Sequence, residues 1–136
     1  MTRQTVNAIG GSMGLTVPSG SVLTVRRLYP ALIRPGDIIC FIDDAGRAVA
    51  HRVMSVRGVG EKALFEVRGD AQDYVEQVPA HAVVYRVDEI RHRLFHYPVD
   101  GPVGRFISAS ALLPVPLLPV LNRAASSVLR RLRRRS

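Results

Sequence analysis

Short β-rich runs fill the middle of the chain and limit the folds that it can adopt. The runs cover residues 22–25, 37–42, 48–56, 63–67 and 82–87. Turn-forming sequences separate them, at Pro35-Gly36-Asp37, at residues 43–46 and at residues 58–60, and no long helical periodicity occurs between them. Five such strands between residues 21 and 88 predict an all-β core, either an antiparallel sheet or a partly open barrel.

The composition is that of a folded domain. Hydrophobic residues make up 47% of the 136 positions and charged residues 22%, which gives enough apolar surface to offset the entropy of ordering the chain. The length suits one domain better than two. We therefore expect a β-rich domain over residues 1–97. Cys40, the one cysteine of the sequence, is interpreted as a small buried hydrophobe within it.

The character of the chain changes at the end of this domain. Prolines and glycines predict a linker over residues 98–105. The apolar stretch that follows contains prolines at positions 114, 116 and 119, and it cannot form one unbroken helix. Residues 106–136 are therefore expected to form a Pro-broken apolar segment followed by an Arg-rich amphipathic helical tail. No stretch is long and apolar enough to be interpreted as a membrane-spanning helix.

Most of the net charge of +8 lies in this tail. Residues 101–136 contain seven arginines and no acidic residue, which gives +7, whereas residues 1–100 carry twelve basic and eleven acidic residues, or +1. An apolar stripe backed by arginines is typical of a helix in the interface of an anionic membrane. The same spacing also fits a helix packed on the body with a solvated basic face. We expect membrane association through the tail, on an undetermined side of the membrane. The near-neutral body disfavours a nucleic-acid partner.

A serine and a histidine are candidates for nucleophilic catalysis. Gly10-Gly11-Ser12-Met13 precedes the first predicted strand, and its glycines would let a substrate approach the serine hydroxyl closely. A serine nucleophile needs a base within hydrogen-bond reach, and His51 interrupts a strand-like run over residues 48–53. Taken singly, the first motif is also typical of a turn, and the second of a structural histidine.

An acidic turn could support that histidine. Three acidic residues follow the fourth β-rich run directly, namely Asp70, Asp73 and Glu76. A carboxylate behind a histidine fixes its tautomer and stabilises the imidazolium. The sequence leaves open which of the three faces His51, and a solvated turn is the alternative. A metal centre is not expected, since His92 and His96 lack a third ligand, and no cofactor is predicted.

Four short motifs occur in one order, and together they carry a family resemblance. They are Gly11-Ser12-Met13 with Pro18-Ser19-Gly20, then Pro35-Gly36-Asp37-Ile38-Ile39, then Ala50-His51-Arg52-Val53, and finally Arg68-Gly69-Asp70-Ala71. The series resembles the boxes of the type I signal peptidase and LexA-like serine protease superfamily. It is most similar to the histidine-type signal peptidases of archaea, the endoplasmic reticulum and sporulating bacteria. The resemblance extends over residues 10–87 and implies a β-rich core of coiled antiparallel sheets.

The resemblance also implies a serine endopeptidase that cuts a precursor polypeptide. Ser12 would be the nucleophile and His51 the general base. Asp70 matches the aspartate of the fourth box, and Glu76 falls where the histidine-type enzymes place a second acid. Oxyanion and substrate binding would fall to the loop backbone at Gly11, Ser12 and Met13. Small side chains such as alanine would be preferred just before the cut.

Three departures from the family pattern motivate an alternative. Gly10 replaces a serine whose hydroxyl helps to bind the oxyanion, and Leu15 and Ser21 replace a proline and an aspartate. Loss of one oxyanion donor lowers the rate by roughly a hundredfold or more in serine proteases. The alternative function is a catalytically weak or inactive peptide-binding module on the same fold. A LexA-like self-cleaving regulator fits less well, because such proteins use lysine as the base and no helix-turn-helix pattern precedes Ser12.

Overall fold

The computed structural model describes residues 3–112 and 117–135. The strands are β1 (Arg3–Asn7), β2 (Val22–Arg26), β3 (Ile38–Ile42), β4 (Ala48–Arg57), β5 (Leu64–Arg68), β6 (Glu76–Pro79), β7 (Val83–His92) and β8 (Phe95–Pro98). Short 3-10 turns occur at Pro30–Leu32, Gly60–Lys62 and Ala80–Ala82, and the helices are α1 (Pro102–Ala111) and α2 (Leu117–Arg135). The described chain is therefore a β-rich body that ends in helices.

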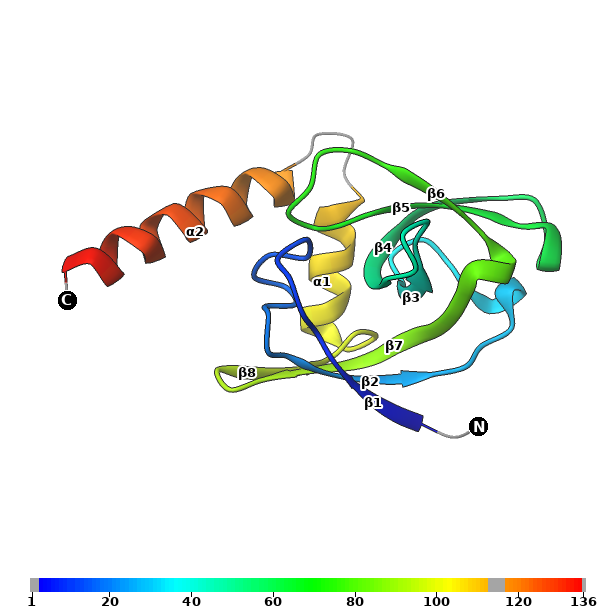
Figure 1. The fold of residues 1–136 in the computed structure, drawn as a ribbon, viewed down its shortest axis with the longest axis horizontal. Coiled ribbons are helices and arrows are strands. Elements are labelled where there is room, and N and C mark those ends of the chain that lie inside the picture. Colours follow the sequence, from blue (N-terminus) through cyan, green and yellow to red (C-terminus); the bar gives the residue numbers. More distant parts are fainter. Residues whose placement is uncertain (1–2, 113–116, 136) are drawn as a thin grey trace.

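The strands belong to one eight-stranded antiparallel sheet that curls on itself (Figure 1). The order of neighbouring strands is β1-β2-β7-β3-β4-β5-β6, and β8 pairs with β7. β7 therefore lies between β2 and β3 and joins strands that are distant in the sequence. The described strands confirm the predicted all-β core, although one curled sheet forms it and not several sheets.

Side-chain alternation divides the core into two clusters. Ile38 and Ile39 are adjacent on β3, are both fully buried, and point to opposite faces of the strand. Ile38 packs in one cluster with Met13, and Ile39 packs in the other with Phe65. Each fully buried aliphatic or aromatic side chain contributes roughly 1.5–3 kcal/mol. Because Met13 belongs to the first cluster, the core fixes the segment that carries Ser12.

Three strands have no counterpart in the prediction from sequence, namely β1, β6 and β8. β1 has the sequence Arg-Gln-Thr-Val-Asn and is exposed along its length. β6 and β8 have four residues each and both end in proline. These strands form by pairing with β2, β5 and β7, so non-local pairing overrides a weak local preference.

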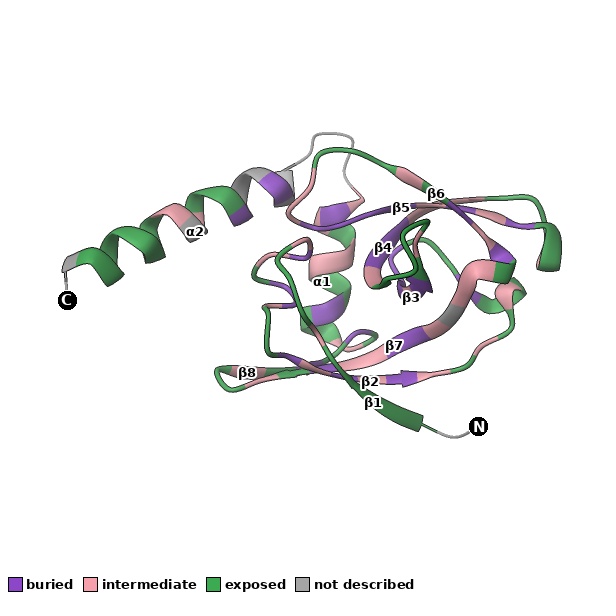
Figure 2. Ribbon diagram, viewed as in Figure 1, coloured by how far each residue is buried: buried purple, intermediate pink, exposed green. Residues whose placement is uncertain are grey.

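Helix α1 starts at Pro102, inside the segment predicted as a linker over residues 98–105. Proline suits the first turn of a helix, because an N–H would have no intrahelical partner there. Pro119 occurs in the first turn of α2, whereas Pro114 and Pro116 lie outside the described residues. Figure 2 shows that the distal half of α2 is exposed. No helix within residues 3–112 and 117–135 is long and apolar enough to cross a membrane.

A buried ion pair ties several elements of the fold together. Arg52 on β4 donates to Asp70, with Nε to Oδ1 at 2.9 Å and Nη2 to Oδ2 at 2.7 Å, and both side chains are 1% exposed. Its Nη1 donates to the Gly36 carbonyl at 2.9 Å and to the Ser108 hydroxyl on α1 at 2.8 Å. The Thr16 hydroxyl donates to Asp70 Oδ2 at 2.6 Å. The pair thus connects the sheet, two loops and α1.

Removal of one partner of this pair should destabilise the fold strongly. In Asp70→Asn the Arg52 charge stays buried without its counter-ion, which costs about 3–5 kcal/mol. We expect that loss in the free energy of unfolding, measured by urea titration at pH 7. The matched control is Arg57→Gln, which removes the more exposed ion pair to Glu66 and should cost less than about 1 kcal/mol. Equal effects of the two substitutions would contradict the central role of the buried pair.

Candidate functional site

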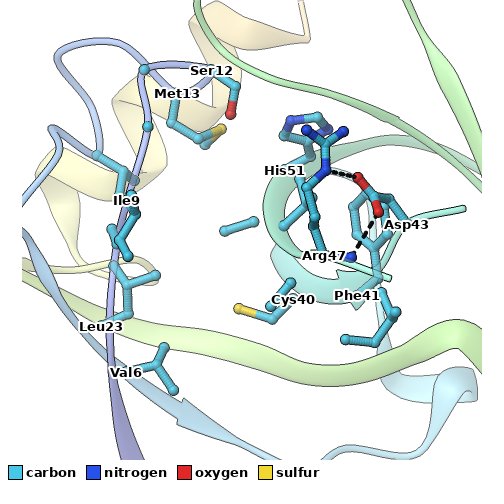
Figure 3. Close-up of a pocket in the computed structure, with 18 of the residues that line it drawn as sticks. Val6, Ile9, Ser12, Met13, Leu23, Cys40, Phe41, Asp43, Arg47 and His51 are labelled. Atoms are coloured by element: carbon cyan, nitrogen blue, oxygen red, sulfur yellow. Dashed lines mark hydrogen bonds and ion pairs between the residues drawn. The ribbon is translucent and has the colours of Figure 1, made fainter. Parts of the chain in front are cut away.

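A cavity of about 620 Å³ lies inside the curl of the sheet. Its wall includes the end of β1, the loop after it, parts of β3 and β4, and the segment that leads into β6. Ser12 comes from the loop and His51 from β4, so the two candidate catalytic residues line one cavity (Figure 3). Apolar side chains such as Val6, Leu23 and Phe41 form much of the remaining wall. The fold thus forms a largely apolar cavity whose polar groups include the Ser12 hydroxyl, the His51 imidazole and the Asp43–Arg47 ion pair.

The Ser12 loop is held against the turn that contains Asp70. The amide of Ala71 donates to the Ser12 carbonyl at 2.9 Å, and the amide of Asp70 donates to Met13 Sδ at 3.4 Å. A Cβ at Gly69 would collide with the Ser12 carbonyl oxygen, so this close approach requires glycine. The turn fixes the backbone of Ser12, while its side chain stays half-buried at the cavity.

The first turns of α2 hold the other side of this loop. Asn122 is 4% exposed, its Oδ1 accepts from the Leu15 amide at 2.7 Å, and its Nδ2 donates to the Asp70 carbonyl at 3.2 Å. Gly14 has a φ of +59° and has no room for a Cβ beside Asn122. Sequence reasoning missed this contact. The available signal was that Asn122 is the one amide side chain in residues 106–136.

His51 is buried and neutral. It pairs with Ile39 across β3 and β4, is 3% exposed, and packs edge-on against the ring of Phe41 with centroids 5.7 Å apart. Burial lowers the pKa of His51 to about 4, although the charge of Asp70 acts in the opposite direction. In the described part of the chain neither ring nitrogen has a hydrogen-bond partner. At pH 7 the ring is therefore an unprotonated base.

The three acidic candidates have different surroundings. Glu76 Oε1 lies 4.0 Å from His51 Nδ1, which is too long for a hydrogen bond and close enough for an electrostatic interaction. Asp70 forms the buried ion pair described above, and it affects His51 through its charge. Asp73 Oδ2 lies 3.7 Å from Arg123 Nη2, and its side chain is 63% exposed. Glu76 is thus the candidate whose carboxylate comes nearest to a ring nitrogen in these contacts.

Further polar groups at the cavity come from the loop backbone and from the acidic turn. Gly11, Ser12 and Met13 line the cavity, so the backbone that was predicted to bind an oxyanion borders it. Gln72 donates from Nε2 to the Tyr74 hydroxyl at 2.7 Å, while its Oε1 is buried without a partner among the described residues. Sequence reasoning missed Gln72, because a glutamine within an acidic turn gives no signal of its own.

Cys40 and His96 have simple local environments. Cys40 lines the cavity, and burial raises the pKa of its thiol to about 11, so the thiol is protonated at pH 7 and unreactive. His96 Nε2 lies 3.4 Å from Glu89 Oε2. Nowhere in the described ranges do three or more His, Cys, Asp or Glu residues form a group that could hold a metal ion.

Comparisons with known proteins give one partial similarity. No protein-family model matches the chain, and no solved structure matches it. The chain is similar to signal peptidase I W of Bacillus subtilis (strain 168), with 30% identity over 74 residues, which cover 54% of this chain and 39% of that protein. The matched part is thus well under half of the length of that relative. The similarity supports a relationship to signal peptidases and assigns no role to individual residues.

The buried neutral state of His51 should make stability depend on pH. The folded-state pKa of about 4 lies below the ordinary value near 6.5, so between these values the unfolded chain binds a proton that the folded chain does not. Stability is therefore fully present above about pH 6.5 and falls as the pH drops towards 4, by up to about 3 kcal/mol from this residue. Urea unfolding at pH 7 and pH 4.5 measures the loss.

The variant His51→Gln isolates this contribution from that of the carboxyl groups. Its stability should change less between pH 7 and pH 4.5 than that of the natural protein. His81→Gln is the matched control, because it also removes one histidine, from an exposed position outside the cavity. An unchanged pH dependence in His51→Gln would show that His51 does not titrate in this way.

Proposed function

We propose that the protein is a serine peptidase of the signal-peptidase kind, in which Ser12 attacks a peptide carbonyl and His51 takes its proton. One observation carries the proposal: both side chains line one apolar cavity, and the Glu76 carboxylate lies 4.0 Å from the histidine ring. The partial similarity to a signal peptidase of Bacillus subtilis supports the same reaction class. The substrate would be a precursor polypeptide.

The proposed reaction proceeds through an acyl-enzyme. His51 Nε2 accepts the Ser12 proton, because Nδ1 is the nitrogen near Glu76, and Ser12 Oγ bonds to the substrate carbonyl carbon. Backbone N–H groups of the Gly11–Met13 loop donate to the resulting oxyanion. The imidazolium then protonates the leaving amine as the C–N bond breaks, and an ester remains on Ser12. Water attacks this ester while His51 takes a proton from the water, and the imidazolium then protonates Ser12 Oγ as the carboxylic acid product leaves.

The base strength of His51 makes Glu76 central to this mechanism. With a pKa of about 4, the ring accepts a proton readily only when the imidazolium is stabilised, and a carboxylate beside it does so. Catalytic contacts are often long before a substrate binds and tighten in the complex. A movement of about 1 Å would bring Glu76 Oε1 from 4.0 Å to hydrogen-bond distance of Nδ1. Asp70 cannot make this movement without leaving Arg52.

The edge strand β1 is the proposed binding place for the substrate. All five of its residues are exposed, and in the described sheet its neighbour is β2 alone. Its other side therefore offers backbone hydrogen bonds to an extended peptide. Val6 and Ile9 line the cavity between this strand and Ser12, so a bound strand would carry its scissile carbonyl towards the nucleophile. A small side chain such as alanine before the cut follows from the family resemblance.

A peptide-binding module without catalysis is the second candidate function. Two observations favour it: the His51 ring nitrogens make no hydrogen bond to Ser12, and Gly10 supplies no hydroxyl for an oxyanion. On this alternative the β1 edge binds the same kind of peptide, and Ser12 is never acylated. The two candidates therefore differ in one measurable event, the formation of a covalent bond to Ser12.

Labelling by a serine-reactive acylating probe tests the nucleophile and the base. We expect a single adduct on Ser12 by mass spectrometry, no adduct in Ser12→Ala, and a rate at least about a hundredfold lower in His51→Ala, because general bases contribute that much. Ser19→Ala is the matched control, since Ser19 is an exposed serine on the same connection between β1 and β2. Unchanged labelling of Ser12→Ala would reject the proposal, and peptide binding without any adduct would favour the binding module.

The role of Glu76 can be separated from that of Asp73. Glu76→Gln should lower kcat/KM for an alanine-containing precursor peptide roughly tenfold or more, because the imidazolium loses its nearby carboxylate. The acidic limb of the pH profile of kcat should also move to lower pH, because the carboxylate that would stabilise the imidazolium in the substrate complex is lost. Asp73→Asn is the control, because it removes another carboxylate of the same turn, the one that pairs with Arg123. It should leave kcat/KM and the pH profile near those of the natural protein. The reverse result would identify Asp73 as the supporting acid.

A further inference from the structure

The distal half of α2 has an apolar stripe that the rest of the described chain does not cover. Val128, Leu129 and Leu132 are 56%, 50% and 59% exposed. With Ala125 they recur at steps of three and four residues, so they share one face of the helix. Figures 1 and 2 show this half of α2 extending away from the sheet as an exposed rod. We call these three exposed residues the α2 stripe.

The stripe continues a groove at the base of the helix. Leu15, Val103, Ile107 and Ala125 line this groove of about 540 Å³ between α1, α2 and β8. Ala125 faces the groove, and one turn later the same face of α2 carries Leu129. The apolar surface is therefore continuous from the body to the exposed end of the helix. Isolated exposed leucines are common, whereas a continuous apolar face indicates a binding surface.

The same helix is strongly basic. α2 contains six arginines and no acidic residue, while residues 1–100 carry a net charge of +1. Arg130, Arg131 and Arg134 are exposed, and the helical repeat places them on the side and back of α2 relative to the α2 stripe. A partner that engages this half of α2 as a whole therefore meets an apolar face backed by a basic one.

We propose that the distal half of α2 lies in the surface of an anionic lipid membrane. The α2 stripe enters the boundary between headgroups and acyl chains, and the positive charge of the arginines attracts the helix to the anionic surface. A second copy of the helix would bring two clusters of positive charge together. A nucleic acid would engage the arginines and leave the α2 stripe exposed to water. The lipid surface satisfies both features of the helix.

The contacts of Asn122 give this binding a consequence for the site. Asn122 and Arg123 tie the start of α2 to the Ser12 loop and to the acidic turn. The six residue steps from Asn122 to Val128 span about 9 Å of helix. A membrane-bound α2 stripe therefore holds the cavity close to the lipid surface, within reach of a polypeptide that emerges from the membrane.

Vesicle flotation of the full chain tests the apolar part of the proposal. We expect binding to phosphatidylcholine vesicles that contain 30 mol% phosphatidylglycerol, and at least tenfold weaker binding to phosphatidylcholine alone. The triple variant V128S/L129S/L132S should bind the anionic vesicles at least tenfold more weakly than the natural chain. Leu94→Ser is the matched control, because Leu94 is 77% exposed and lies in the β7–β8 turn. It should bind as the natural chain does.

The charged part is tested in the same assay. Replacing Arg130, Arg131 and Arg134 with glutamine should lower binding to anionic vesicles by roughly a hundredfold, since each arginine near such a surface contributes about fivefold. Replacing Arg91 and Arg93 near the β7–β8 turn should have little effect. Circular dichroism and probe labelling of Ser12 in each variant show whether the body stays intact. A loss of vesicle binding with an intact body is therefore distinct from a failure of the proposed peptidase activity.

Three results would overturn the proposal. The first is equal binding of the natural chain to anionic and zwitterionic vesicles. The second is full vesicle binding by V128S/L129S/L132S with an intact fold. The third is a clear preference of the natural chain for double-stranded DNA over anionic vesicles at the same ionic strength, with DNA binding unaffected in the serine variant. In that case the arginines alone, without the α2 stripe, would determine what α2 binds.

Discussion

The buried ion pair between Arg52 and Asp70 is the interaction on which the other parts of the structure depend. Neighbouring side chains on a strand point to opposite faces, so β4 directs Arg52 towards Asp70 and directs His51 into the cavity. The turn that carries Asp70 also holds the Ser12 backbone through the amide of Ala71. The pair therefore sets the position of the strand with the histidine relative to the loop with the serine. Its hydrogen bond to Ser108 extends this control to α1.

Burial acts on the site in two opposite ways. It keeps His51 neutral at physiological pH, which a general base requires, and it also weakens the ring as a base. A low dielectric strengthens any charge that comes close to the ring. Glu76 keeps 39% of its side chain exposed, so its carboxylate stays partly solvated, whereas the neighbouring imidazole of His51 is buried. In the proposed mechanism the base strength of His51 therefore depends on how near the Glu76 carboxylate comes to the buried ring.

The parts of the fold that the sequence predicted are those in which local pattern and tertiary structure agree. Each of the runs that became β2, β3, β4, β5 and β7 contains buried side chains, and glycines occur in the turns between them. β1 could not be predicted, because its exposed residues show no alternation and it forms only by pairing with β2. The order of motifs brought Ser12 and His51 forward as candidates, but a turn with three acids does not reveal which carboxylate faces inward. In the structure Asp70 is paired with Arg52, and Glu76 Oε1 lies 4.0 Å from His51 Nδ1.

The hydrogen bonds of Asn122 to the Leu15 amide and the Asp70 carbonyl make the start of α2 part of the same cooperative unit as the Ser12 loop. The Leu15 amide donates to Asn122 Oδ1, so its hydrogen is protected only while α2 is seated on the body. Protection of that one amide against solvent exchange therefore follows the opening of the helix, and not the global unfolding of the sheet. The Ser12 loop and the start of α2 therefore open together. The ordering of this loop depends on α2 as well as on the β body.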